Sequence, residues 1–156
     1  EAGDNVVMTR TFSKLYALGG LRLGWAYCST DVADVLNRVR NPFNVAAPAQ
    51  AAGLAALQDT AFADAGRAHN AKWLPWITEQ ARALGLEVPD SAGNFVLVRF
   101  PNAPDRDADA ADAIFRDRGI IVRRMGAYGL PDALRITVGR EDEMRAIAEA
   151  LDAFVD

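Results

Sequence analysis

The sequence predicts an α/β protein in which short strands alternate with helices. Two strand-like segments, residues 5–10 and 21–29, flank a glycine-rich loop, and from residue 86 the order is strand, strand, helix, strand, strand, helix. Of the 156 residues, 51% are hydrophobic and 24% are charged, which is a globular composition. A chain of this length buries roughly 68–70% of the surface that its unfolded form exposes, so a core can form.

The first two strands are predicted from β-branched residues and from the turn between them. Residues 5–10 are rich in valine and threonine, and Gly19-Gly20 marks a turn before the second strand over 21–29. Trp25 and Tyr27 are expected on one face of that strand, because side chains alternate along a strand. A long glycine-rich loop between two strands is expected at a sheet end, where ligands usually bind.

Three helices are predicted next. Ser29-Thr30-Asp31 is an N-cap cluster for a helix over 31–40, and an alanine-rich helix over 46–57 has Pro48 in its first turn. Asp59-Thr60 begins a long helix that extends to about residue 84, where Gly85 ends it. Pro75 lies inside this long helix and either kinks it or marks a break.

The second part of the chain predicts a small sheet covered by helices. The predicted strands are 86–88, 94–100, 120–123 and 133–138, and the predicted helices are 108–118 and the segment from residue 141. The last helix carries an apolar stripe at helical spacing, which is typical of an amphipathic helix. The strongest strand pattern in the chain is that of residues 94–100.

Charge and cysteine content exclude several classes of function. A net charge of −4 and a pI near 5.0 argue against a nucleic-acid or anionic-membrane surface. No stretch reaches the ~18 apolar residues of a membrane span, and no Cys/His cluster indicates a metal site. Cys28 is the single cysteine, so no internal disulfide forms, which fits a reducing, cytoplasmic compartment. The chain begins with Glu1 rather than Met, and we expect it to be part of a longer protein.

The loop over residues 10–24 carries the candidate chemistry. Lys14 follows Ser13 in a nearly uncharged segment, and Arg22 comes eight residues later. A lysine that forms a Schiff base with an aldehyde cofactor must react as a neutral amine, which apolar neighbours and a nearby cation favour. Thr11, Ser13 and Arg22 supply the donors that a cofactor phosphate needs. Spacing alone leaves a second interpretation open, in which Lys14 is a solvated surface lysine.

The pattern Ser-Lys-x3-Leu-x-Gly-Leu-Arg-x-Gly over residues 13–24 resembles the cofactor-lysine signature of the fold-type I aminotransferases, which use pyridoxal 5′-phosphate. Residues 39–44, 119–123 and 129–139 extend the match, and within that group the chain is most similar to the histidinol-phosphate aminotransferase family. The resemblance implies the C-terminal portion of such an enzyme. It implies a remnant of the cofactor-binding large domain over 1–58, a connecting helix over 59–85, and a small α+β C-terminal domain over 86–156.

The resemblance also implies individual roles. Lys14 would hold the cofactor as a Schiff base and move the substrate proton, while Thr11, Ser13 and Arg22 would bind the cofactor phosphate. Arg135 would meet the acidic group common to the substrates, such as the carboxylate of glutamate. Arg123 would lie near the phosphate of histidinol phosphate, and Tyr16 would line the pocket. The loop before Arg135 is one residue shorter than in the family. An edge ion pair for Arg135 and a surface position for Arg123 are the ordinary alternatives.

The same resemblance implies that part of the site lies outside this sequence. The family places the carboxylate for the pyridine nitrogen, the stacking ring and the hydroxyl for the phenolic oxygen before the lysine. Only thirteen residues precede Lys14, and of these only Glu1 and Asp4 are acidic, neither of them well placed. We therefore expect negligible transaminase activity from the chain alone. Homodimers are expected from the family. The alternatives are an aromatic-amino-acid aminotransferase, a threonine-phosphate decarboxylase, or a folded fragment that binds no cofactor.

Overall fold

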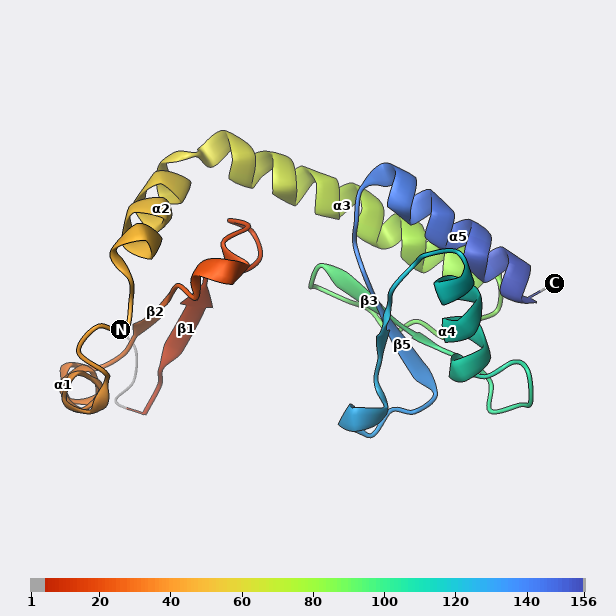
Figure 1. Ribbon diagram of the computed structural model, residues 1–156, viewed down its shortest axis with the longest axis horizontal. Coiled ribbons are helices and arrows are strands. Elements are labelled where there is room, and N and C mark those ends of the chain that lie inside the picture. Colours follow the sequence, from red (N-terminus) through yellow and green to blue (C-terminus); the bar gives the residue numbers. More distant parts are fainter. Residues whose placement is uncertain (1–4, 156) are drawn as a thin grey trace. The chain divides into compact units, whose positions relative to one another are not determined.

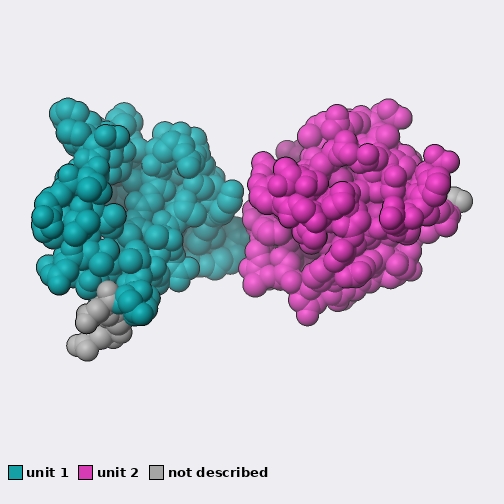
Figure 2. All heavy atoms as spheres, turned by 90° about the horizontal axis from the view of Figure 1, so that it is seen from below, with its two compact units in different colours: residues 1–67 teal, residues 68–156 magenta. Residues whose placement is uncertain are grey.

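The computed structural model describes residues 5–155, so the candidate carboxylates Glu1 and Asp4 lie outside the described residues. The chain forms two compact units, one up to Arg67 and one from Ala68 onward (Figure 2). The predicted α/β class is confirmed, with helices and strands interspersed along the chain (Figure 1).

The first unit contains a two-stranded antiparallel ribbon. Strand β1 spans Met8–Thr11 and pairs with β2, Gly24–Tyr27, with Thr11 opposite Gly24. The predicted second strand over 21–29 was too long. A 3₁₀ turn, η1 (Gly19–Leu21), occupies its start, and Arg22 adopts a left-handed backbone with φ of 54°, which cannot continue a strand.

Helices of the first unit match the predictions closely. Helix α1 spans Thr30–Val39 and α2 spans Ala47–Gln58, with proline in the first turn of α2. The buried residues of α2 are Ala49 and Gly53, one helical turn apart. These small side chains allow neighbouring residues to approach the helix closely.

Helix α3 spans Thr60–Ala83, and the boundary between the two units falls inside it. The Asp59 carboxylate accepts a hydrogen bond of 2.9 Å from the Phe62 backbone, as expected of a helix cap. Gly85, with φ of +79°, ends the helix, and its amide donates to the Arg82 carbonyl at 3.0 Å. The helix continues through Pro75, so the predicted break does not occur.

The second unit contains a three-stranded antiparallel sheet in the order β3-β5-β4. Strand β3 spans Phe95–Arg99, β4 spans Arg123–Arg124 and β5 spans Ala133–Thr137. Helix α4, Ala108–Asp117, connects β3 to β4; a 3₁₀ turn, η2 (Gly126–Tyr128), precedes β5; and helix α5, Glu141–Val155, follows it. The predicted strands over 86–88 and 120–123 were too long. The first is a single bridge between Glu87 and Arg99, and the second forms a ladder only at its end.

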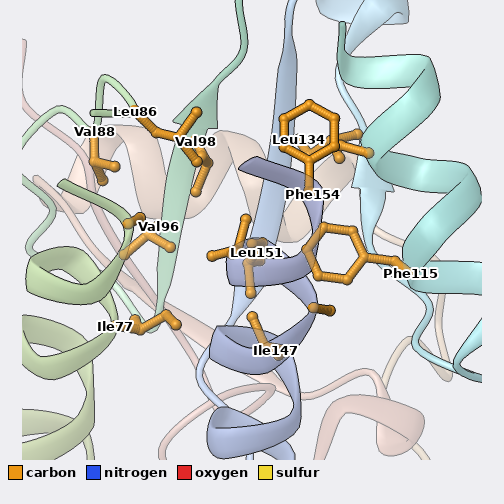
Figure 3. Close-up of a cluster of buried hydrophobic side chains, with 14 of the residues drawn as sticks. Ile77, Leu86, Val88, Val96, Val98, Phe115, Leu134, Ile147, Leu151 and Phe154 are labelled. Carbon is orange, nitrogen blue, oxygen red and sulfur yellow. The ribbon is translucent and has the colours of Figure 1, made fainter. Parts of the chain in front are cut away.

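One face of this sheet carries the hydrophobic core (Figure 3). Val96 and Val98 of β3 and Leu134 and Ile136 of β5 are at most 1% exposed. Helices α3, α4 and α5 complete the cluster with Ile77, Phe115, Leu151 and other apolar residues. Because side chains alternate across a strand, the intervening residues lie on the opposite face of the sheet. That face holds Leu97, Arg99, Arg123 and Arg135.

Candidate functional site

The predicted site residues fall into two groups. Thr11, Ser13, Lys14, Tyr16 and Arg22 belong to the first unit, and Arg123 and Arg135 belong to the second.

The lysine loop of the first unit, residues 11–24, is closed by backbone hydrogen bonds at its base. Phe12 donates its amide to the Leu23 carbonyl at 3.1 Å and accepts from the Leu18 amide at 3.0 Å. Gly24 is required here because a Cβ atom at this position would lie 2.7 Å from the Arg10 carbonyl oxygen across the ribbon. The ladder and these bonds bring residues 11–13 beside residues 22–24.

Phe12 fixes this loop to the unit's interior. Its side chain is 5% exposed and its ring centroid lies 4.9 Å from that of Tyr16. A Cβ atom on Gly53 of α2 would lie 2.4 Å from Leu23 Cδ2 and 3.8 Å from the Phe12 ring. Helix α2 therefore packs directly against the loop, and Tyr16 packs against the Phe12 ring.

The Thr11 and Ser13 hydroxyls are joined to each other. Thr11 Oγ1 donates to Ser13 Oγ at 2.8 Å and accepts from the Ser13 amide at 3.1 Å. Arg22 Nη1 donates to the Gly19 carbonyl at 2.7 Å, and no carboxylate within residues 5–155 forms an ion pair with Arg22. Two hydroxyls and a guanidinium that no described carboxylate neutralises lie beside the same loop base and suit a phosphate dianion.

Lys14 lies at the outer side of the loop and its side chain is exposed. The Ala17 amide donates to the Lys14 carbonyl at 2.9 Å, which closes a turn around the lysine. Apolar neighbours were expected to favour a neutral amine, but the nearby Phe12 ring packs inward against α2, and Lys14 is exposed among the described residues. Lys14 forms no ion pair with any described carboxylate.

The two arginines of the second unit are brought together by strand register. Arg123 of β4 and Arg135 of β5 are direct partners in the antiparallel ladder. Both line a cavity of about 590 Å³, whose other walls include Ile120, Val122, Ile136, Met144 and Ile147. Neither arginine has an ion-pair partner among the described residues, so the edge ion pair that was the ordinary alternative for Arg135 is absent from residues 5–155.

Arg99, on the same sheet face, shows what a structural arginine looks like here. Its guanidinium lies 2.7 Å from an Asp132 oxygen and 4.0 Å from a Glu87 oxygen. The hydrogen bond to Asp132 raises the pKa of Arg99 above its ordinary value. Two carboxylates thus neutralise Arg99, whereas no described carboxylate pairs with Arg123 or Arg135.

Sequence reasoning missed Phe95, which contacts the candidate site. The Arg135 Cζ atom lies 5.1 Å from the centroid of the Phe95 ring. In the sequence, Phe95 is only one member of an alternating strand. The pairing of Leu97 with Arg135 brings Phe95 and Arg135 together, and a single sequence contains no signal for that register.

Trp73, Trp76 and His69 of α3 contact other residues of the second unit. Trp73 is 3% exposed and packs edge-on against Trp76, and His69 Nε2 lies 2.7 Å from the Gly139 carbonyl oxygen. Cys28 is half-buried. Within residues 5–155 no group of three or more His, Cys, Asp or Glu side chains could hold a metal ion. The helices of this part of the chain are too short or too polar to cross a membrane.

Comparisons with known proteins cover nearly the whole chain. Residues 1–151 match the family model described as aminotransferase class I and II. The histidinol-phosphate aminotransferase of Paramagnetospirillum magneticum is 63% identical over 155 residues, 99% of this chain and 43% of that protein. The enzyme of the same name from Rhodospirillum rubrum is 55% identical over 99% of this chain and 42% of its own length.

Solved structures agree in fold. The crystal structure of histidinol-phosphate aminotransferase from Sinorhizobium meliloti in complex with pyridoxal-5′-phosphate is 33% identical, with a TM-score of 0.82 over 97% of this chain and 41% of that one. The chain therefore spans less than half the length of the relatives that it matches.

Proposed function

The chain belongs to the class I and II aminotransferases, and from that premise we propose that its protein moves an amino group between histidinol phosphate and 2-oxoglutarate. The observation that carries the proposal is the facing pair Arg123 and Arg135, which no carboxylate of residues 5–155 neutralises. The substrates of this reaction are anions, with a phosphate on histidinol phosphate and two carboxylates on 2-oxoglutarate. Two cations on one sheet face suit such ligands.

Pyridoxal 5′-phosphate is the proposed cofactor, and the lysine loop fits it on chemical grounds. When bound, it supplies an aldehyde that accepts amines and a ring that withdraws electrons from the reacting carbon. The Arg22 guanidinium and the Thr11 and Ser13 hydroxyls would hold its phosphate. This assignment is supported by the hydroxyl pair at 2.8 Å and by the absence of a described carboxylate partner for Arg22.

Lys14 is the proposed catalytic residue. Its ε-amine would attach to the aldehyde and, once released by the substrate amine, would accept and return the proton moved at the substrate Cα atom. An exposed lysine on a loop anchored by Phe12 can be reached by a ligand while its backbone stays fixed.

The two arginines would divide the substrate between them. Arg135 would bind a carboxylate through its planar fork, and Arg123 would bind the phosphate of histidinol phosphate. Both residues are among those that line one cavity of the second unit, which supports a shared role in ligand binding.

Reductive labelling tests the role of Lys14 sharply, because the chain contains only two lysines, Lys14 and Lys72. Lys72 lies 3.8 Å from Glu141 and 4.6 Å from the Trp73 ring, so it serves as an internal control. After incubation with pyridoxal phosphate and borohydride, we expect the pyridoxyl mass on the Lys14 peptide and little on the Lys72 peptide. Lys14→Arg should abolish it. Equal labelling of both lysines, or none in a folded chain, would instead support a fragment that binds no cofactor.

Substrate choice is tested by turnover. We propose that this chain alone has negligible activity with histidinol phosphate and 2-oxoglutarate, and that a protein of the relatives' full length carrying it is active. Measurable turnover by the 156-residue chain would contradict the first statement. A full-length protein that prefers phenylalanine would indicate an aromatic-amino-acid aminotransferase, and one that decarboxylates threonine phosphate would indicate the decarboxylase.

We further propose a cytoplasmic homodimer. The apolar surface of the first unit supports self-association, since Phe43 is 96% exposed and Val39 is 72% exposed. A single cysteine fits a reducing compartment. Light scattering of a full-length protein should give the mass of two chains, and a monodisperse monomer would contradict the dimer.

A further inference from the structure

An aromatic ring, rather than a carboxylate, holds the Arg135 guanidinium. The Arg135 Cζ atom lies 5.1 Å from the Phe95 ring centroid. Arg135 Nε is buried without a hydrogen-bond partner, and no carboxylate among residues 5–155 pairs with this side chain. An arginine within about 6 Å of a ring centroid is attracted by the negative face of the ring.

Strand register creates this contact. Leu97 lies directly opposite Arg135, and Phe95 lies opposite Thr137, so Phe95 is the diagonal neighbour of Arg135 on the same face of the sheet. Diagonal neighbours in an antiparallel pair are within reach of aromatic and long side chains.

The segment that carries the ring is itself anchored. Ser91 Oγ donates to the Phe95 carbonyl at 2.7 Å and accepts from the Gly93 amide at 3.2 Å. Asn70 of α3 donates its side-chain amide to the Gly93 carbonyl at 3.0 Å. A Cβ atom on Gly93 would lie 3.2 Å from Phe95 Cε1, so this glycine leaves room for the ring.

A comparison with Arg99 shows why an aromatic ring is a better neighbour than a carboxylate for an arginine that binds an anion. Asp132 and Glu87 fix Arg99, but they also neutralise its charge. A phenyl ring restrains the guanidinium without competing with an anion for its N–H donors. An arginine restrained beforehand loses less side-chain freedom when it binds a carboxylate.

We propose that Phe95 is the positioning residue for substrate carboxylate binding by Arg135. This inference rests on the proposed function, because it assumes that Arg135 meets a carboxylate. Phe95 acts through Arg135: the ring orders the guanidinium and leaves its donors free for the ligand.

The test compares Phe95→Leu, which keeps an apolar side chain, with Phe95→Tyr, which keeps the ring. In the 156-residue chain, ¹⁵N relaxation of the Arg135 Nε–H group reports its order, and titration with 2-oxoglutarate and glutarate reports carboxylate binding. Amide spectra verify that each variant is folded. Tyr128→Leu is the matched control, because the Tyr128 hydroxyl lies 3.5 Å from Arg123 Nη1, whereas the ring over which the Arg135 guanidinium lies is that of Phe95.

We expect Arg135 to lose order in Phe95→Leu and to bind dicarboxylate roughly fivefold more weakly, as the loss of one cation–π contact implies. Phe95→Tyr should restore both, and Tyr128→Leu should leave both unchanged. Unaltered Arg135 order and affinity in a folded Phe95→Leu chain would overturn the role of Phe95 alone. A different outcome is that Phe95→Leu lowers the order of Arg135 but the wild-type chain binds neither 2-oxoglutarate nor glutarate. That result would overturn the proposed role of Arg135 in carboxylate binding, and the positioning role of Phe95 with it.

Discussion

Arg123 and Arg135 face each other across neighbouring strands with no described carboxylate between them. In an antiparallel sheet, like charges placed directly opposite destabilise the pair. The repulsion between the two guanidinium groups therefore lowers the stability of the sheet at this position. Such an arrangement is expected at a site where a bound anion offsets the repulsion.

Removing one of these charges should therefore stabilise the chain. Arg123→Thr is expected to raise the free energy of unfolding by about 0.2–1 kcal/mol, because it relieves the cross-strand repulsion. Its neighbour Arg124 provides a matched control, since Arg124 is paired with Asp109. Urea unfolding should show no gain for Arg124→Thr. Equal effects of both substitutions would show that the facing arginines do not repel each other measurably.

Two glycines of the lysine loop should differ in their tolerance of alanine. In Gly24→Ala the new Cβ atom would lie 2.7 Å from the Arg10 carbonyl oxygen, a backbone atom that cannot move without separating β1 from β2. We expect a loss of about 1–3 kcal/mol in unfolding free energy, together with loss of pyridoxyl labelling at Lys14. Gly20→Ala is the control, because a Cβ atom there meets nothing within 4 Å. Wild-type labelling in Gly24→Ala would contradict the close packing at the loop base.

The two partners of the ion pair on α4, Asp112 and Arg116, should differ in how much stability is lost when each is replaced by alanine. Asp112 is 4% exposed, and its Oδ2 atom accepts from Arg116 Nε at 2.8 Å while Oδ1 has no partner. Arg116→Ala leaves the buried charge unpaired and should destabilise the chain by about 1–3 kcal/mol. Asp112→Ala removes the charge as well and should cost less. Thermal melts show which variant loses more stability, and a larger loss in Asp112→Ala than in Arg116→Ala would contradict this prediction.

The free energy of unfolding should fall in acid in part because Glu141 becomes protonated. A hydrogen bond from Arg145 lowers the pKa of Glu141 below its ordinary 4.5, although partial desolvation opposes the shift. Since the folded pKa lies below the unfolded one, this contribution is present above pH 4.5 and is lost as the pH falls through the folded pKa. The melting temperature of Glu141→Gln should accordingly decline less than wild type between about pH 5 and 3.

Glu149→Gln serves as the control for this acid effect, because Glu149 lies on the same helix and forms no ion pair within the described residues. Its melting temperature should follow wild type throughout. Parallel curves for Glu141→Gln and wild type would show that the Arg145 hydrogen bond adds no stability.

Much of the fold followed from local sequence signals. The three helices of the first part were predicted within a few residues, because proline at the start of α2, Asp59 as a cap and Gly85 as a terminator act locally. Strand ends were predicted poorly. Arg22 adopts a left-handed backbone, so β2 begins only at Gly24, and residues 120–122 do not pair although they are β-branched.

The sequence by itself determined the family, the lysine loop as the candidate cofactor site, and the identities of its candidate donors, because these depend on residue types at fixed spacing along the chain. Only the tertiary structure placed Arg123 opposite Arg135 and brought Phe95 beside the Arg135 guanidinium. It also paired Arg99 with carboxylates, whereas no described carboxylate pairs with Arg123 or Arg135. These relationships depend on strand register. Register is set by the packing of the whole core, and a shift of one residue would turn each of these side chains to the other face of the sheet.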